Sequence, residues 1–174
     1  MTKTQLTLLR IAAVLVVIGI SVFVYRIRDN AAGLAIYGYP GIFLLAFLAY
    51  ATVFLPAPGL AVIFTMGAVF NPFGVALAAS AGAALGELSG YLAGFSGQPI
   101  IERAALYEWL YKWMHKNGPI SVFVMAALPN PFFDLAGVVA GILKMSLLNF
   151  LIWCWLGEFT KMLAFAYAGS GILK

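Results

Sequence analysis

The chain reads FLPAPGLAVIF over residues 54–64 and LPNPFFDLAG over residues 128–137, so two prolines interrupt each of two apolar runs. A proline inside a helix removes a backbone donor and clashes with the preceding turn, at a cost of about 3 kcal/mol or more. Each apolar run must therefore change direction at its break. We predict two re-entrant hairpins, with tips at Pro56, Pro58 and Gly59 and at Pro129, Asn130 and Pro131.

The apolar segments beside the breaks are short. A helix that crosses a bilayer needs about 20 residues. Residues 60–70 are too few, and Asn71-Pro72-Phe73-Gly74 is a strong turn signal, so residues 40–70 are expected to form the first hairpin. Residues 120–143 are expected to form the second hairpin in the same way.

A segment long enough to cross a membrane follows each hairpin, at residues 74–95 and 147–173. Gly86-Glu87 in the first segment matches Gly157-Glu158 in the second. A broken hairpin followed by a span with a central glutamate thus occurs twice, which is typical of transporter repeats. The fold prediction is an all-α integral membrane protein containing an inverted repeat.

The composition agrees with a membrane protein. Hydrophobic residues make up 64% of the 174 residues, charged residues 9%, and the mean hydropathy is +1.01. The net charge of +4 lies in connecting segments, where it sets topology, so we expect no nucleic-acid partner. Cys154 is the only cysteine, and no nucleophile–base pair or metal-ligand spacing is present. We expect no cofactor, no metal and no enzymatic activity.

The domain prediction has four parts. Residues 1–39 hold an N-terminal transmembrane helix and a link, residues 40–97 the first repeat, residues 98–118 an interfacial amphipathic helix, and residues 119–174 the second repeat. With the lysine and arginine of residues 1–10 inside the cell, the positive charges of residues 98–118 fall on the cytoplasmic side as well. The two hairpins then enter from opposite faces of a multi-pass cell-membrane protein.

Small residues form a ridge along the first span, at Gly82, Gly86, Gly90 and Gly94. Such a ridge allows a neighbouring helix to approach closely. We favour packing within the chain and leave a homo-oligomer open.

Four ionisable residues are expected at membrane depth: Glu87, Asp134, Glu158 and Lys161. Each costs about 2.5–3.5 kcal/mol there unless it has a partner or a polar cavity. Glu87 has no basic residue within helical reach, so it is expected to be protonated or to face a cavity. Glu158 and Lys161 are three residues apart and either neutralise each other or bind an anionic group. Asp134 either caps the second half of its hairpin or handles protons.

The chain resembles the DedA superfamily, also called SNARE-associated or VTT-domain proteins. The resemblance rests on residues 54–59, on GELSGYLAG at residues 86–94, and on residues 128–134 leading to Gly141. It implies two opposed re-entrant hairpins and a role in moving undecaprenyl phosphate or phospholipids between leaflets. Many bacterial members carry an arginine where this chain has Ala126, and Lys161 is the cation that could take its place.

The leading hypothesis is therefore a lipid transporter or scramblase, with membrane lipids as partners and proton coupling left open. The alternative is a proton-coupled transporter of a small ion or solute, with Glu87 and Glu158 as relays. A third hypothesis is a structural membrane protein whose hairpins only pack. The repeat and the position of Glu87 argue against this third hypothesis.

Overall fold

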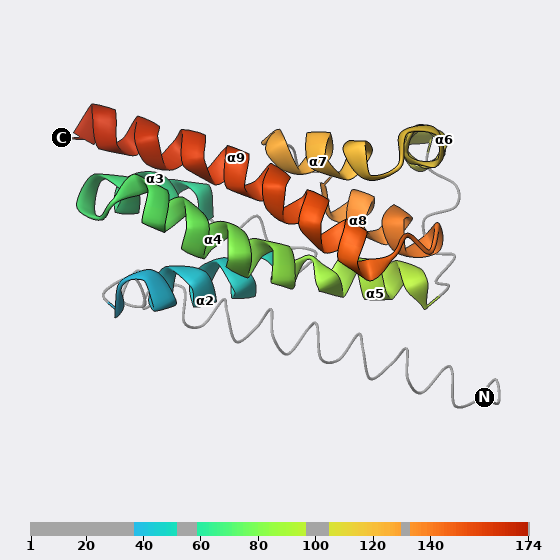
Figure 1. The fold of residues 1–174 in the computed structure, drawn as a ribbon, viewed down its shortest axis with the longest axis horizontal. Helices are drawn as coiled ribbons and strands as arrows, with labels where there is room; N and C mark the ends of the chain where they lie inside the picture. The colour runs from blue at the N-terminus through green and yellow to red at the C-terminus, as the bar shows by residue number, and fades with distance from the viewer. Residues whose placement is uncertain (1–36, 52–58, 97–104, 130–132, 174) are drawn as a thin grey trace.

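The computed structural model describes residues 37–51, 59–96, 105–129 and 133–173. These residues form helices and short links only, which confirms the predicted all-α class (Figure 1). The helices are α2 (Tyr39–Tyr50), α3 (Gly59–Val69), α4 (Pro72–Gly86), α5 (Leu88–Phe95), α6 (Ala105–Asn117), α7 (Pro119–Ala127), α8 (Phe133–Ile142) and α9 (Leu147–Leu173). The predicted N-terminal helix and the tip residues Pro56, Pro58, Asn130 and Pro131 lie outside the described residues.

Helix α4 begins where the sequence predicted a turn. The Asn71 side-chain oxygen accepts hydrogen bonds from the backbone N–H groups of Phe73 at 3.0 Å and Gly74 at 3.3 Å. Asn71 is therefore an N-cap, and Pro72 occupies the first turn, where its missing N–H costs nothing. The turn signal marks the start of the spanning segment, so α4 begins two residues earlier than predicted.

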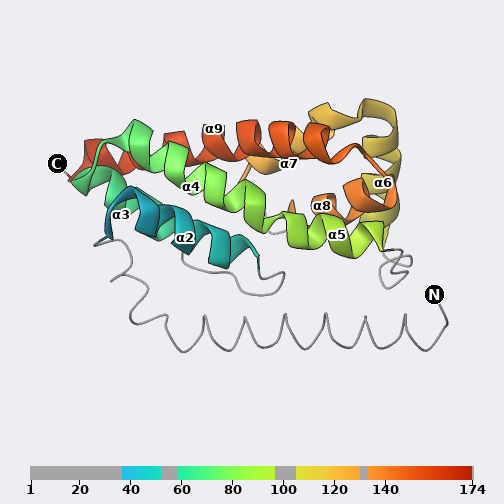
Figure 2. The same ribbon diagram turned by 60° about the horizontal axis from the view of Figure 1, so that its bottom comes forward.

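The helices pair across the two halves of the chain. Helix α2 packs on α4, and helix α7 packs on α9. Each of these short helices thus contacts the long helix that follows it in the same half of the chain. Helix α3 packs on α9 and α8 packs on α5, so these two helices contact the opposite half. The long helices α4 and α9 also pack on each other, and the shorter helices pack around this central pair (Figures 1 and 2).

Glycines bring these helix pairs into backbone contact. A Cβ atom added at Gly94 would overlap the carbonyl oxygen of Val138, and one at Gly141 would overlap that of Tyr91, so α5 and α8 fit together only because both positions lack a side chain. The small-residue ridge serves two neighbours: Gly82 and Gly86 face α2, whereas Gly94 faces α8. Gly90 is buried on the same helix. The ridge therefore packs within the chain.

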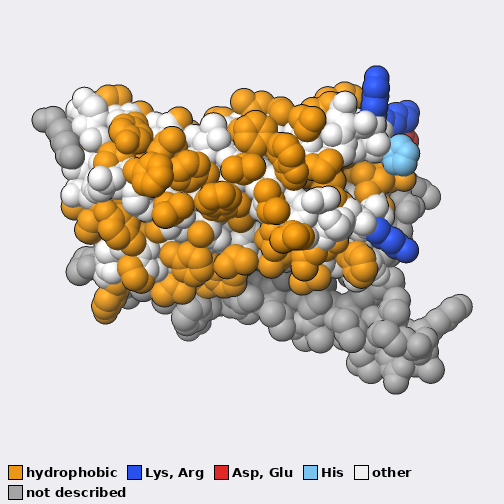
Figure 3. Space-filling model, in the orientation of Figure 1, with side chains coloured by type: hydrophobic (Ala, Val, Ile, Leu, Met, Phe, Trp, Pro, Cys, Tyr) orange, Lys and Arg blue, Asp and Glu red, His pale blue; other side chains and the backbone are white. Residues whose placement is uncertain are grey.

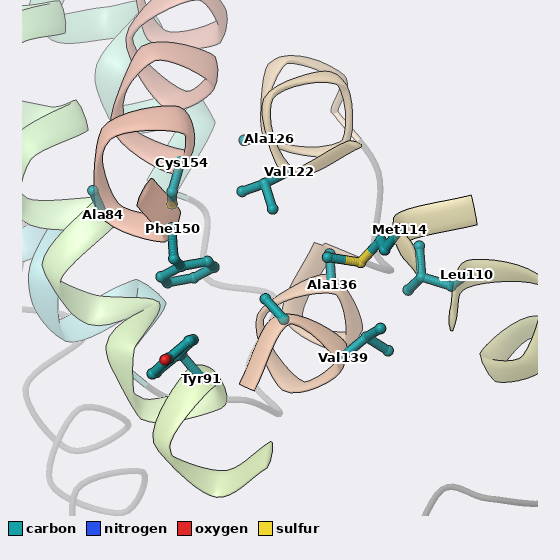
Figure 4. Close-up of a cluster of buried hydrophobic side chains, with 11 residues drawn as sticks. Ala84, Tyr91, Leu110, Met114, Val122, Ala126, Ala136, Val139, Phe150 and Cys154 are labelled. Atoms are coloured by element: carbon teal, nitrogen blue, oxygen red, sulfur yellow. The ribbon is translucent and has the colours of Figure 1, made fainter. Parts of the chain in front are cut away.

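The buried side chains form two separate apolar clusters. The first joins the end of α4, α5, α6, α7, α8 and the first half of α9, and Figure 4 shows Tyr91 of α5 beside Phe150 of α9 in this cluster. Their ring centroids are 5.0 Å apart, and the Tyr91 hydroxyl donates to the carbonyl oxygen of Met145 at 2.6 Å. The second cluster joins α2, α3, α4 and the later part of α9, around Ile42, Ile63 and Met162.

Large apolar side chains are exposed on most of the described helices. Among the described residues, one helical stretch, Pro72–Phe95, is long and apolar enough to cross a membrane, with 24 residues and a mean hydropathy of 1.3. Leu77, Leu85 and Leu92 of this stretch are exposed. In the face shown in Figure 3, apolar side chains cover the sides of the molecule and basic side chains gather at one end.

Candidate functional site

Three of the four predicted ionisable residues are buried in the described structure. Glu87 is 2% exposed, Glu158 is 0% exposed and Lys161 is 6% exposed. Glu87 lies at the junction between α4 and α5, and the other two lie near the middle of α9. Charged side chains almost never occupy such positions unless they are paired.

Glu158 and Lys161 form an ion pair inside the protein. The Lys161 Nζ atom donates to Glu158 Oε1 at 2.6 Å, across one turn of α9. A pair this deeply buried gains strong Coulomb attraction but also carries a large desolvation cost. The helix geometry explains the contact, because residues three apart lie on the same face of an α-helix.

Tyr50 places an aromatic ring beside the same ammonium group. Lys161 Nζ lies 5.4 Å from the centre of the Tyr50 ring, within the range of a cation–π interaction. Tyr50 is the last residue of α2, so the pair on α9 is linked to the helix that leads to the first predicted tip. The role of Tyr50 could not be predicted from the sequence, because no local spacing connects it with Lys161.

Glu87 interrupts the long helix formed by α4 and α5. Its backbone N–H donates to the Ala83 carbonyl at 2.9 Å, and its own carbonyl accepts from the Tyr91 N–H at 3.2 Å, so helical hydrogen bonding continues through the junction. Its carboxylate points toward α8. A Cβ atom at Gly137 would lie 3.5 Å from Glu87 Oε2. Gly137 therefore lies beside this carboxylate, and nothing in the local sequence relates the two residues.

The buried charges converge near Cys154. This thiol is buried on α9, one turn before Glu158, and lies within electrostatic range of Glu87, Glu158 and Lys161. Cys154 belongs to the first apolar cluster and Met162, one turn after Glu158, belongs to the second. The three ionisable groups therefore occupy the boundary between the two clusters, which we call the polar belt.

The other predicted site residues either lie away from the polar belt or fall outside the residues that the structure describes. Asp134 is the second residue of α8, but its side chain lies outside what the structure describes. Gly59 is the first residue of α3, and Pro129 is exposed after the end of α7. The structure therefore buries Glu87, Glu158 and Lys161 in the region around Cys154, and the arrangement of the two hairpin tips stays a prediction.

The polar belt is defined chemically by its charged groups. Within the described ranges, no group of three His, Cys, Asp or Glu side chains is arranged to hold a metal ion. The belt contains one cation held by one carboxylate, with a second carboxylate nearby. Such a set can exchange a proton or an anionic group with a partner that reaches it.

The described residues are helical, expose many large apolar side chains and bury charges near the middle of the long helices, which is typical of membrane-associated helical proteins. A family model, the VTT domain, matches residues 55–171, which is more than half of the chain. The chain therefore belongs to the VTT-domain family, the domain of DedA and SNARE-associated proteins, and the predicted resemblance is confirmed. No curated protein and no solved structure matches it.

Proposed function

We propose that this protein is a multi-pass cell-membrane transporter or scramblase that moves a lipid between the two leaflets. The observation that carries the proposal is the polar belt, because a buried Glu158–Lys161 pair and a further buried carboxyl group, Glu87, are costly in a molecule that exposes apolar side chains. Ionisable residues at membrane depth generally mark a path for an ion, a proton or a charged group. Undecaprenyl phosphate and phospholipids both carry such a charged group.

The depth of the belt supports this proposal. Glu158 lies near the middle of α9, roughly 16 Å from its first residue at 1.5 Å per residue. The hydrocarbon core of a bilayer is about 30 Å thick. If α9 crosses the membrane, the pair lies close to the midplane, where transporters built from inverted repeats place their substrate.

The helix pairing supports an inverted repeat. The contact of α2 with α4 corresponds to that of α7 with α9, and the contact of α3 with α9 corresponds to that of α8 with α5. Each long helix is thus held between one hairpin arm of its own half and one of the other half. Two halves related in this way can rock against each other around a fixed central site.

In the proposed mechanism, a lipid headgroup crosses at the polar belt while its acyl chains stay in the bilayer. Lys161 supplies the positive charge, and Glu158 holds that charge when no lipid is present. An anionic headgroup that reaches Lys161 takes the place of the Glu158 carboxylate, which then needs a proton or a polar neighbour. Glu87 is the other buried carboxyl group that can take up or release a proton in this exchange.

A second candidate function is a proton-coupled transporter of a small ion or solute. The observation that favours it is the closeness of two buried carboxylates, Glu87 and Glu158, to one side chain, Cys154. Two carboxylates in one apolar region can pass a proton between the two sides of a membrane without any lipid substrate.

Reconstitution into vesicles separates the two functions. We expect the purified protein to move fluorescent phospholipids between leaflets without changing the signal of an encapsulated ion- or pH-sensitive dye. Glu158→Gln/Lys161→Met is the matched variant, because it removes both charges of the pair together. Ion or proton flux without lipid movement would reject the lipid proposal in favour of the second candidate.

A further inference from the structure

Helix α6 uses one face for packing and leaves other large side chains uncovered. Leu110 and Met114 lie one turn apart, are buried, and belong to the first apolar cluster. Trp109 is 54% exposed and Tyr111 is 36% exposed on the same helix. Since Leu110 and Met114 already attach α6 to the protein, the exposed aromatic side chains are available to contact something else.

The exposed tryptophan lies beside a row of lysines. Trp109 and Trp113 stack with ring centroids 5.5 Å apart, and Lys112 and Lys116 follow each of them by three residues. Residues three and four apart are neighbours on a helix surface. The two tryptophans and the two exposed lysines therefore form adjacent rows along one side of α6.

Lys144 adds a third positive charge at the same end of the molecule. It is exposed in the turn between α8 and α9, where its backbone φ is 52° and its N–H donates to the Gly141 carbonyl at 3.0 Å. That turn and α6 lie at the same end of the helix bundle in both views (Figures 1 and 2). The basic side chains visible in Figure 3 also gather there.

We propose that Trp109, Lys112, Trp113, Lys116 and Lys144 form a binding surface for anionic phospholipid headgroups of one leaflet. We call these five residues the α6 surface. The proposal rests on the proposed function in one respect, because it requires the apolar sides of the protein to lie in a bilayer. Indole rings prefer the headgroup region of membranes, and clustered lysines attract anionic lipids.

Charge and position favour lipid over a soluble acidic partner. Among the described residues at this end, Glu108 is the one exposed carboxylate against three exposed lysines, so the surface is positive overall. Trp109 is 54% exposed next to these lysines, so an indole ring and amines are presented at the same level of the molecule. A surface that combines indole rings with amines at that level matches a membrane interface better than a water-facing protein contact.

The test uses the full chain in vesicles of phosphatidylcholine that contain a small fraction of brominated lipid, which quenches tryptophan fluorescence. Trp153 and Trp155 are replaced by Phe, because the chain has four tryptophans and the other two are Trp109 and Trp113. Brominated phosphatidylglycerol is compared with brominated phosphatidylcholine at the same fraction. Each lysine near a membrane surface attracts anionic lipid by up to about fivefold, so we expect clearly stronger quenching by phosphatidylglycerol.

The variants make the assignment specific. Lys112→Gln/Lys116→Gln/Lys144→Gln should equalise the quenching by the two brominated lipids, and added salt should weaken the difference in the parent protein. Glu108→Gln is the matched control on the same helix, and it should increase the preference for phosphatidylglycerol. Spin-labelled phosphatidylglycerol bound to the wild-type chain gives the same comparison without replacing any tryptophan.

Equal quenching of the parent protein by both lipids, together with equal retention of both spin-labelled lipids, would overturn the lipid assignment and leave the lysine row to a soluble acidic partner. Lipid transport measured in the same vesicles keeps the two proposals apart. A protein that prefers phosphatidylglycerol but moves no lipid would support the α6 surface and reject the proposed function. A protein that moves lipid without this preference would support the proposed function and reject the α6 surface.

Discussion

Removing one partner of the buried ion pair should destabilise the protein far more than removing both. Lys161→Met leaves the Glu158 carboxylate, which is 0% exposed, without the ammonium group that lies 2.6 Å away. Breaking a buried pair in this way costs about 3–5 kcal/mol. For a chain of this length, 1 kcal/mol shifts the unfolding midpoint by about 2–4 °C, so the expected loss is about 6–20 °C.

The double variant Glu158→Gln/Lys161→Met should recover most of that loss. Replacing both members of a buried pair by neutral side chains of similar size is often close to neutral, because the desolvation cost disappears together with the attraction. Thermal unfolding of the detergent-purified protein, followed by fluorescence, measures the single and double variants in one cycle. Lys112→Met is the control, since Lys112 is exposed on α6 and its loss should change the midpoint little.

One outcome of this mutant cycle would contradict the prediction. If the double variant is no more stable than Lys161→Met, the two side chains are not energetically coupled. The contact at 2.6 Å would then contribute nothing to stability, and the description of the polar belt as a charge-balanced unit would be wrong.

Three further predictions concern other contacts. Gly169→Ala should destabilise the protein by about 1–3 kcal/mol, because the new Cβ would overlap the Phe64 carbonyl oxygen where α3 contacts α9. Gly171→Ala on the same helix is the control, since its Cβ would meet open space, and this variant should be neutral or stabilising. Equal unfolding midpoints of the two variants would contradict this prediction. The proton exchange proposed for Glu87 should make transport depend on pH, so Glu87→Gln should leave the fold intact and abolish that dependence; an unchanged pH profile would reduce this residue to a packing role. Tyr50→Leu should destabilise the protein by about 0.5–2 kcal/mol through loss of the cation–π contact, while Tyr50→Phe should retain that contact; equal losses would refute it.

The local helices could be predicted from the sequence because their signals are local. The predicted final span and α9 share the bounds Leu147–Leu173. The position of Glu158 beside Lys161 followed from helical spacing alone. The start of α4 was displaced by two residues, because an Asn-Pro pair favours a turn and a helix N-terminus equally well.

The packing of distant segments could not be predicted in the same way. The small-residue ridge was recognised, but its division between α2 at Gly82 and α8 at Gly94 depends on which helices lie beside it. Tyr50 and Gly137 became part of the site only because α2 and α8 approach the long helices in three dimensions. Neither residue has a sequence pattern that relates it to a charge more than 45 positions away.

The most direct test of lipid movement at the polar belt uses a fluorescent phospholipid in both leaflets of reconstituted vesicles. Dithionite added outside destroys only the fluorescence that reaches the outer leaflet. The account predicts that wild-type protein lets nearly all the fluorescence disappear, whereas the Glu158→Gln/Lys161→Met variant, folded but without the charged pair, leaves the inner half protected. Protection of the inner half by the wild-type protein, or full loss with the variant, would contradict the central claim.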